Sequence, residues 1–197
     1  MNDSTQASTR YGALSRWLHW SMAVMILAML FIGVGMVASL SLRPLLLDIH
    51  RPLGLAILVL ALLRLRHRRR HPPPPLPASL PAPQAMAARA SHWLLYGLML
   101  AMPLLGWAML SAGGYPVRMT SSFALPPILS PDPALYSLLR QAHGWVGYAL
   151  FALILLHAAA ALHHAWVRRD GVFEAMARGR SRTTTTAEPD PGTPPES

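Results

Sequence analysis

The stretch HGWVGYALFALILLH at 143–157 carries two histidines, one at each end, and no charged residue between them. The two histidines are fourteen positions apart. On an α-helix this spacing gives a rise of about 21 Å and returns the side chain to within about 40° of its starting direction. One helix then presents two imidazoles on one face at two depths. Ionisable side chains in an apolar helix are costly and are usually kept because they line a pathway or hold a cofactor. The spacing therefore predicts two sites stacked along one helix.

Long uncharged segments surround this stretch and predict a membrane protein. No charged residue lies between Arg140 and Arg168, between Arg16 and Arg43, or between Arg89 and Arg118. Each gap exceeds the roughly 20 residues that a helix needs to cross a bilayer core. A weaker fourth candidate covers about 45–65, with Arg51 near one end, where its long side chain can reach the interface.

The fold expected from these segments is all-α, an integral membrane four-helix bundle in a single domain at 1–180. The helices are expected at about 11–39, 45–65, 90–112 and 135–167, followed by a disordered polar tail at 181–197. The segment 113–134, rich in Gly, Pro and Ser, is long for a connection within a bundle, which suggests that it caps something.

Charge predicts how the bundle is oriented. The chain has a formal net charge of +9, and all 17 of its basic residues are arginine. They concentrate at both termini and between the second and third segments, so the positive-inside rule places both termini in the cytoplasm. The run HRRRH at 67–71 lies at the end of an apolar segment. This position favours contact with anionic lipid over the binding of nucleic acid. The absence of cysteine excludes disulfides, iron–sulfur clusters and c-type haem attachment.

Depth along the helices sorts the histidines into two levels. His50 and His143 lie near the outer face, and His19 and His157 lie on the inner side. Two imidazoles on opposite sides of a haem iron give a six-coordinate centre suited to electron transfer, so two stacked haems are the expected cofactors. At the inner level, His164 or His92 would match the shallow His19 better than His157 does, and the spacing leaves this choice open.

Glycines and arginines recur on the same helix faces. A flat macrocycle requires close approach of the backbone, which glycine permits, and arginine can pair with haem propionates. Plain helix packing in a membrane and interfacial anchoring would also explain such residues. The candidates for the haem pocket are Gly33, Gly54, Gly147, Arg64 and Arg140.

Four stretches together resemble the bacterial cytochrome b561 family, small di-haem cytochromes of the inner membrane, over about residues 10–180. They are RYGALSRWLHW at 10–20, IHRPLGLAILVLALLRLRHRRRHPPPP at 49–75, SHWLLYGLMLAMPLLGW at 91–107 and AHGWVGYALFALILLHAAAALHH at 142–164. The resemblance implies two b haems, ligated by His19 with His157 and by His50 with His143. Beyond its GGYP at 113–116, the segment 113–134 matches the family poorly.

The resemblance also implies electron transfer with ubiquinone or another membrane quinone. One activity among similar proteins is the oxidation of superoxide with ubiquinone as the electron acceptor. Arg43, Arg51, Arg118 and Arg140 would make the outer mouth attractive to that small anion. A first alternative is a cytochrome b anchor subunit that receives electrons from a periplasmic redox partner, a dehydrogenase or hydrogenase. A second is a haem-free transporter, which the lack of any intramembrane carboxylate disfavours.

Overall fold

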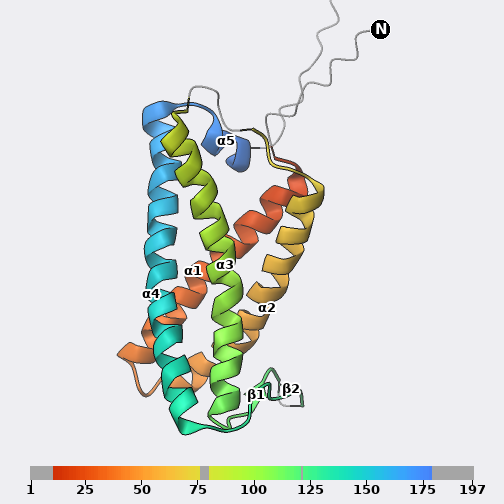
Figure 1. Cartoon of the computed structure of the whole chain (residues 1–197), viewed down its shortest axis with the longest axis vertical. Helices are drawn as coiled ribbons and strands as arrows, with labels where there is room; N and C mark the ends of the chain where they lie inside the picture. Colours follow the sequence, from red (N-terminus) through yellow and green to blue (C-terminus); the bar gives the residue numbers. More distant parts are fainter. Residues whose placement is uncertain (1–10, 76–79, 121, 179–197) are drawn as a thin grey trace, which may run out of the picture.

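The computed structural model describes residues 11–75, 80–120 and 122–178 of the chain. Four long helices form most of it: α1 (Ala13–Ala38), α2 (Arg43–Arg70), α3 (Ala82–Ala112) and α4 (Pro133–His163) (Figure 1). A π-helical turn (His164–Arg168) extends α4, and a short helix α5 (Val172–Ala177) follows it. The four long helices are each long and apolar enough to cross a membrane. The prediction of an all-α protein with four such helices is confirmed, and the predicted disordered tail at 181–197 lies outside the described residues.

Two helices extend further than predicted, both at the same end of the bundle. α2 continues to Arg70, although its apolar segment was expected to end near residue 65, and α3 begins at Ala82 instead of near residue 90. Arginine and alanine are both strong helix formers, so neither the basic run after Leu65 nor the stretch AMAARA at 85–90 interrupts a helix. Hydropathy marks the part of a helix that lies in lipid, and the helix itself ends where capping residues or proline end it.

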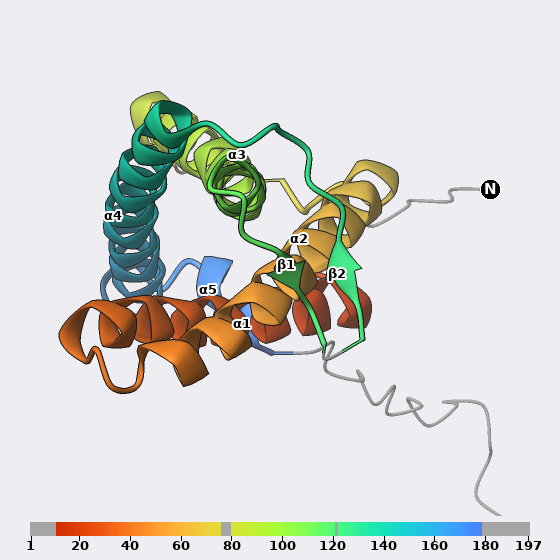
Figure 2. The same cartoon turned by 90° about the horizontal axis from the view of Figure 1, so that it is seen from below.

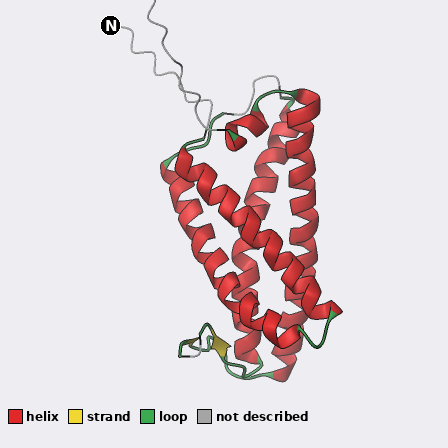
Figure 3. Ribbon diagram, turned by 180° about the vertical axis from the view of Figure 1, so that it is seen from behind, coloured by secondary structure: helices red, strands yellow, loops and turns green. Residues whose placement is uncertain are grey.

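The four helices pack as two pairs. α1 lies along α2 and α3 lies along α4, and α2 joins the pairs through α3. α4 makes hardly any close backbone contact with α1 or α2 among the described residues. α1 crosses behind α3 in the view of Figure 1 and in front of it in Figure 3, and Figure 2 shows α1 beside α2. One end of the bundle carries α5 and is called the α5 end; the opposite end carries a short β-hairpin and is called the hairpin end (Figure 1).

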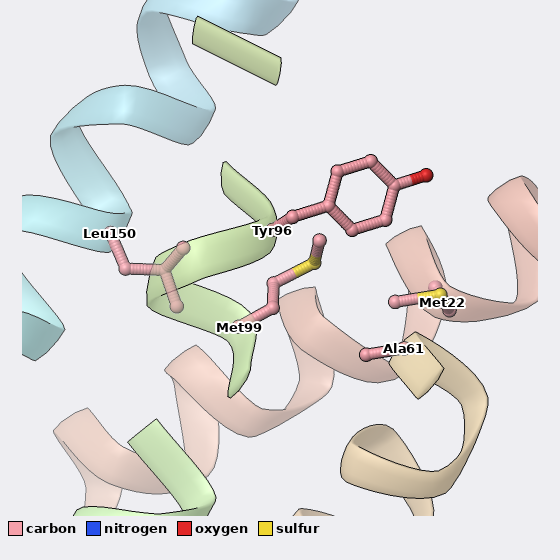
Figure 4. Close-up of a cluster of buried hydrophobic side chains, with 5 residues drawn as sticks. All are labelled: Met22, Ala61, Tyr96, Met99 and Leu150. Carbon is pink, nitrogen blue, oxygen red and sulfur yellow. The ribbon is translucent and has the colours of Figure 1, made fainter. Parts of the chain in front are cut away.

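A small apolar core holds the four helices together between these ends. Met22 of α1, Ala61 of α2, Tyr96 and Met99 of α3 and Leu150 of α4 form one buried cluster (Figure 4). Met22 is 1% exposed and Ala61 is fully buried. The core is narrow, and many large apolar side chains of the helices are exposed, as expected of helices that are solvated by lipid.

The connection at 113–132 forms a hairpin that the sequence did not predict. β1 (Val117–Arg118) pairs antiparallel with β2 (Ala124–Leu125), with Val117 opposite Leu125. Buried Ser111 fixes the loop to α3, because its Oγ accepts a hydrogen bond from the Ile128 N–H at 3.1 Å. The Asp132 carboxylate then caps α4 by accepting hydrogen bonds from the N–H groups of Ala134 and Leu135. The segment thus covers the end of α3 and a flank of α2.

Candidate cofactor site: two pairs of imidazoles

At the hairpin end, His50 of α2 and His143 of α4 face each other. Their ring centres lie 6.2 Å apart and the ring planes are inclined at 61°. The Nδ1 atom of His50 is buried and has no hydrogen-bond partner within the described part of the chain. A buried polar atom without a partner is costly, and it is a common sign that a group is missing from the site.

Toward the α5 end, three imidazoles converge. The ring centres of His19 on α1 and His157 on α4 are 6.3 Å apart with planes inclined at 71°. His92 of α3 lies on another side of His157, with the two ring centres 5.6 Å apart. His157 is therefore adjacent both to His19, its expected partner, and to His92, which the sequence left open as the alternative partner of His19.

The separations test whether a metal ion fits between the rings. An imidazole nitrogen lies about 2.0 Å from a bound transition metal and about 1.1 Å from its own ring centre, so two rings on opposite sides of one ion stand about 6.2 Å apart. The His50–His143 and His19–His157 separations of 6.2 Å and 6.3 Å match this value. The His92–His157 separation of 5.6 Å is shorter than a shared ion requires. The residues present therefore fit an iron held at each of two levels.

Both matching pairs bridge helices that do not otherwise pack against each other. Each pair joins α4 to α1 or α2, and α4 has hardly any close backbone contact with either helix in the described residues. Since the two α4 histidines are fourteen residues apart, the pairs lie about 21 Å apart along that helix. A flat macrocycle needs space between the helices that carry its ligands, and helices with so little direct contact leave that space.

His164, the other candidate for the inner level, has a different environment. Its Nδ1 lies 2.6 Å from Oδ2 of Asp170, and the guanidinium of Arg168 lies 3.3 Å from the same oxygen. Burial alone would raise the pKa of Asp170, but hydrogen bonds from His164 and from the Val172 N–H, with the charges of His164 and Arg168, lower it below its ordinary value. His164 thus belongs to the corner between α4 and α5.

The predicted glycines differ in their surroundings. A Cβ at Gly33 would meet no atom within 4 Å, so open space adjoins α1 there. At Gly54 and Gly147 a Cβ would touch a methionine side chain at 3.6 Å, an ordinary contact. The sequence reasoning missed Gly106 of α3, where a Cβ would lie 3.4 Å from Cε1 of His143. The only sign of Gly106 in the sequence was its place beside Trp107, at the end of the stretch SHWLLYGLMLAMPLLGW that resembles the family.

The two predicted arginines also differ. Arg64 lies inside the bundle, with its guanidinium 5.7 Å from the ring centre of Tyr96, whereas Arg140 is exposed at the start of α4. A more buried cation at the hairpin end is Arg51, next to His50. Its side chain is 16% exposed and lies 3.8 Å from Asp48, and its Nε is buried without a partner in the described residues.

The sequence is similar to known proteins over most of its length. The family model described as prokaryotic cytochrome b561 matches residues 10–179. A protein of Escherichia coli (strain K12) named cytochrome b561 homolog 2 is 29% identical over 179 residues, covering 87% of this chain and 93% of the relative. A second protein of the same strain, cytochrome b561 homolog 1, is 34% identical over 97 residues, covering 49% of this chain and 54% of the relative.

Proposed function

The chain belongs to the prokaryotic cytochrome b561 family, and on this premise we propose that it is a di-haem electron carrier of the bacterial inner membrane. The family is one of membrane cytochromes and implies haem b. The observation that carries the proposal is the two imidazole pairs, with ring centres 6.2 Å and 6.3 Å apart. His50 with His143 and His19 with His157 are the proposed axial ligands. When bound, haem b supplies a one-electron carrier at each level.

The proposed orientation places both chain termini and the α5 end in the cytoplasm. The α5 end holds the arginines of the basic run at the end of α2 and those after α4. The hairpin end has fewer, and its Arg51 is partly offset by Asp48. Positive charge is retained on the cytoplasmic side, so the hairpin faces outward.

The proposed partners are superoxide on the outside and a membrane quinone. Two superoxide anions each lose one electron and become dioxygen, and one ubiquinone takes these two electrons with two protons and becomes ubiquinol. Arg43, Arg118 and Arg140 are exposed and would raise the local concentration of a small anion at the hairpin end. An open apolar groove of about 510 Å³ between α2 and the hairpin begins at Pro52, two residues after His50, and would suit an isoprenoid tail.

Haem counting tests the di-haem assignment. The purified full-length protein is expected to bind two haems per chain, measured by a reduced-minus-oxidised spectrum with quantitative haem extraction. His157→Ala should lose one haem, because it removes the shared imidazole at its level. His164→Ala should retain both, because His164 contacts Asp170. A colourless wild-type protein from cells that make haem freely would refute the proposal, and haem loss confined to His164→Ala would refute the ligand assignment.

Kinetics with superoxide test the proposed donor. Replacing exposed Arg140 with Gln should slow reduction of the haems by superoxide at low ionic strength by a factor on the order of two to five, and added salt should remove the difference. The measurement follows the haem α-band after a pulse of superoxide, with a ubiquinone analogue as acceptor. Arg66→Gln makes the same charge change at the α5 end and should leave the rate unchanged. Equal rates for all three proteins at low salt would exclude electrostatic steering.

A further inference from the structure

A small cleft at the α5 end has basic and hydroxyl side chains in its lining beside Pro73 and Met176, and no carboxylate among the described residues that line it. It lies between α1, α2, α3 and α5, and its polar lining includes Tyr11, Ser15, Arg64, His67, Arg68 and Tyr96. His67 Nε2 and Ser15 Oγ lie 3.0 Å apart and satisfy each other, so they fix one wall. Burial raises the pKa of Tyr11, although Arg68 and Arg64 oppose the shift, so this phenol stays neutral and adds no negative charge.

Tyr96 contributes to this lining a buried hydroxyl that lacks a partner among the described residues. Its side chain is 6% exposed, and its Oη is buried without a hydrogen-bond partner within the described residues. In Figure 4 the phenol oxygen points away from Leu150, on the side of the cluster where Met22 lies. A buried hydroxyl is normally hydrogen-bonded, so an unpartnered one that lines a cleft indicates an acceptor that binds there.

Two guanidinium groups supply positive charge beside this phenol. The Cζ atoms of Arg64 and Arg68 lie 5.7 Å and 5.8 Å from the centre of the Tyr96 ring. Among the described residues, neither arginine forms an ion pair with a carboxylate. In apolar surroundings, cation–π contact alone compensates the charge of an arginine only weakly. Two arginines beside one unpartnered hydroxyl donor therefore indicate that an anion binds between them. The ligand class is an oxyanion, which guanidinium and phenol groups both bind well.

The position of the cleft identifies the source of this oxyanion. Ser15 lies four residues before His19 on α1, and Tyr96 lies four residues after His92 on α3, so both share helix faces with imidazoles of the α5-end level. We propose that Arg64, Arg68 and the Tyr96 hydroxyl form a cradle for a carboxylate of the haem held by His19 and His157. The inference rests on the proposed function. It adds Arg68 and Tyr96 as positioning residues to Arg64, which the sequence already indicates as a candidate for the haem pocket. Phospholipid phosphate shares this chemistry and is distinguished by the test.

The experiment measures both haem midpoint potentials in the full-length protein, in vesicles of phosphatidylcholine only. Removing a positive charge near one haem favours its ferric form, so Arg68→Gln should lower one of the two midpoints and leave the other unchanged. Tyr96→Phe removes only the hydroxyl, whose dipole screens the carboxylate, and should lower the same midpoint by less. Arg66→Gln, an exposed residue on the same helix, is the matched control and should shift neither. The second haem serves as an internal reference in every variant.

Haem content and esterified haem separate the possible outcomes. With haem dimethyl ester, which has no free carboxylate, Tyr96→Phe should produce no shift relative to the wild type. Two bound haems with both midpoints unchanged in Arg68→Gln and Tyr96→Phe would overturn the cradle while leaving the proposed function intact. A midpoint shift that appears in these variants only when anionic phospholipid is added would also overturn the cradle, and it would assign the cleft to lipid phosphate. A wild type without haem would instead refute the proposed function.

Discussion

Gly106 leaves room for the ring of His143. A Cβ built at Gly106 would lie 3.4 Å from Cε1 and 3.7 Å from Nδ1 of that imidazole, which is near the limit of ordinary contact. A methyl group would fit at this distance, whereas a branched side chain that extends toward the ring would crowd it. Since His143 pairs with His50 at a separation that suits one iron, the absence of a side chain on α3 helps to set the position of a ligand on α4.

Replacing Gly106 with leucine is therefore expected to cost one haem of the two. The branched side chain would overlap the His143 ring and displace it by more than an axial ligand tolerates. Haem content and the low-spin absorbance of the purified variant measure the effect. Gly97→Leu is the matched control on the same helix, because a Cβ at Gly97 would meet no atom within 4 Å. Two intact haems in Gly106→Leu would show that Gly106 does not position His143.

The sequence predicted the candidate ligands better than it predicted their surroundings. The fourteen-residue spacing placed His143 and His157 on one face of one helix, and the structure brings His50 and His19 opposite them. Gly106 and the partnerless Tyr96 hydroxyl could not be found in this way, because each depends on a contact between helices. Periodicity describes one helix at a time, and the rotation of one helix against another has no comparable signal in a single sequence.

At the scale of elements, the corner between α4 and α5 is held by one carboxylate. Asp170 lies 2.6 Å from His164 Nδ1 and 3.3 Å from the Arg168 guanidinium, and the chain reverses there through left-handed residues at Arg169 and Gly171. α5 then returns to α1, where the Tyr11 N–H donates to the Ala175 carbonyl and the Trp20 indole N–H donates to the Met176 carbonyl. Asp170 thereby links the end of the last long helix to the beginning of the first.

Removing this carboxylate should loosen α5 alone. Asp170→Ala is expected to weaken the corner by on the order of 1–2 kcal/mol and to speed amide exchange in α5 about tenfold at neutral pH. Because the folded state lowers the pKa of Asp170, its contribution is present above the ordinary value of 3.8 and is lost as the pH falls below it. Hydrogen–deuterium exchange, corrected for intrinsic rates, measures both effects. Asp48→Ala at the hairpin end should leave α5 unchanged, and equal protection in all three proteins would contradict the assignment.

Predictions at the scale of elements succeeded for helix number and failed for connections. Long apolar segments, three of them uncharged, located all four helices, because a membrane requires long apolar stretches. The hairpin at 117–125 was missed, since its two-residue strands are held by Ser111 and Trp107 of α3 more than by any strand pattern of their own. α5 was missed for a similar reason: six residues are too few to produce a periodic signal.

At the scale of the whole molecule, the two ends differ in charge and in covering structure. The α5 end combines the basic run that ends α2 with α5, whereas the hairpin end carries the two short strands and the Asp132 cap. The proposed direction of electron flow depends on which end meets the cytoplasm. Orientation is therefore the property of the whole molecule that most needs measurement.

Reporter fusions give that measurement. A green fluorescent protein fused after Ser197 is expected to fluoresce, and alkaline phosphatase at the same point to be inactive, because the positive-inside rule holds this end in the cytoplasm. Phosphatase inserted between Thr120 and Ser122, in the hairpin, should be active. The opposite pattern would reverse the proposed topology, and superoxide would then have to reach the α5 end.

Both levels of imidazoles share α4, and this places a limit on how the segment between them can change in length. One inserted residue anywhere in 144–156 would turn His157 by about 100° around the helix and shift it by about 1.5 Å. A single deletion would do the same in the opposite sense. Related genes are therefore expected to differ by insertions and deletions in the connections between helices and to keep the number of residues between these two positions constant.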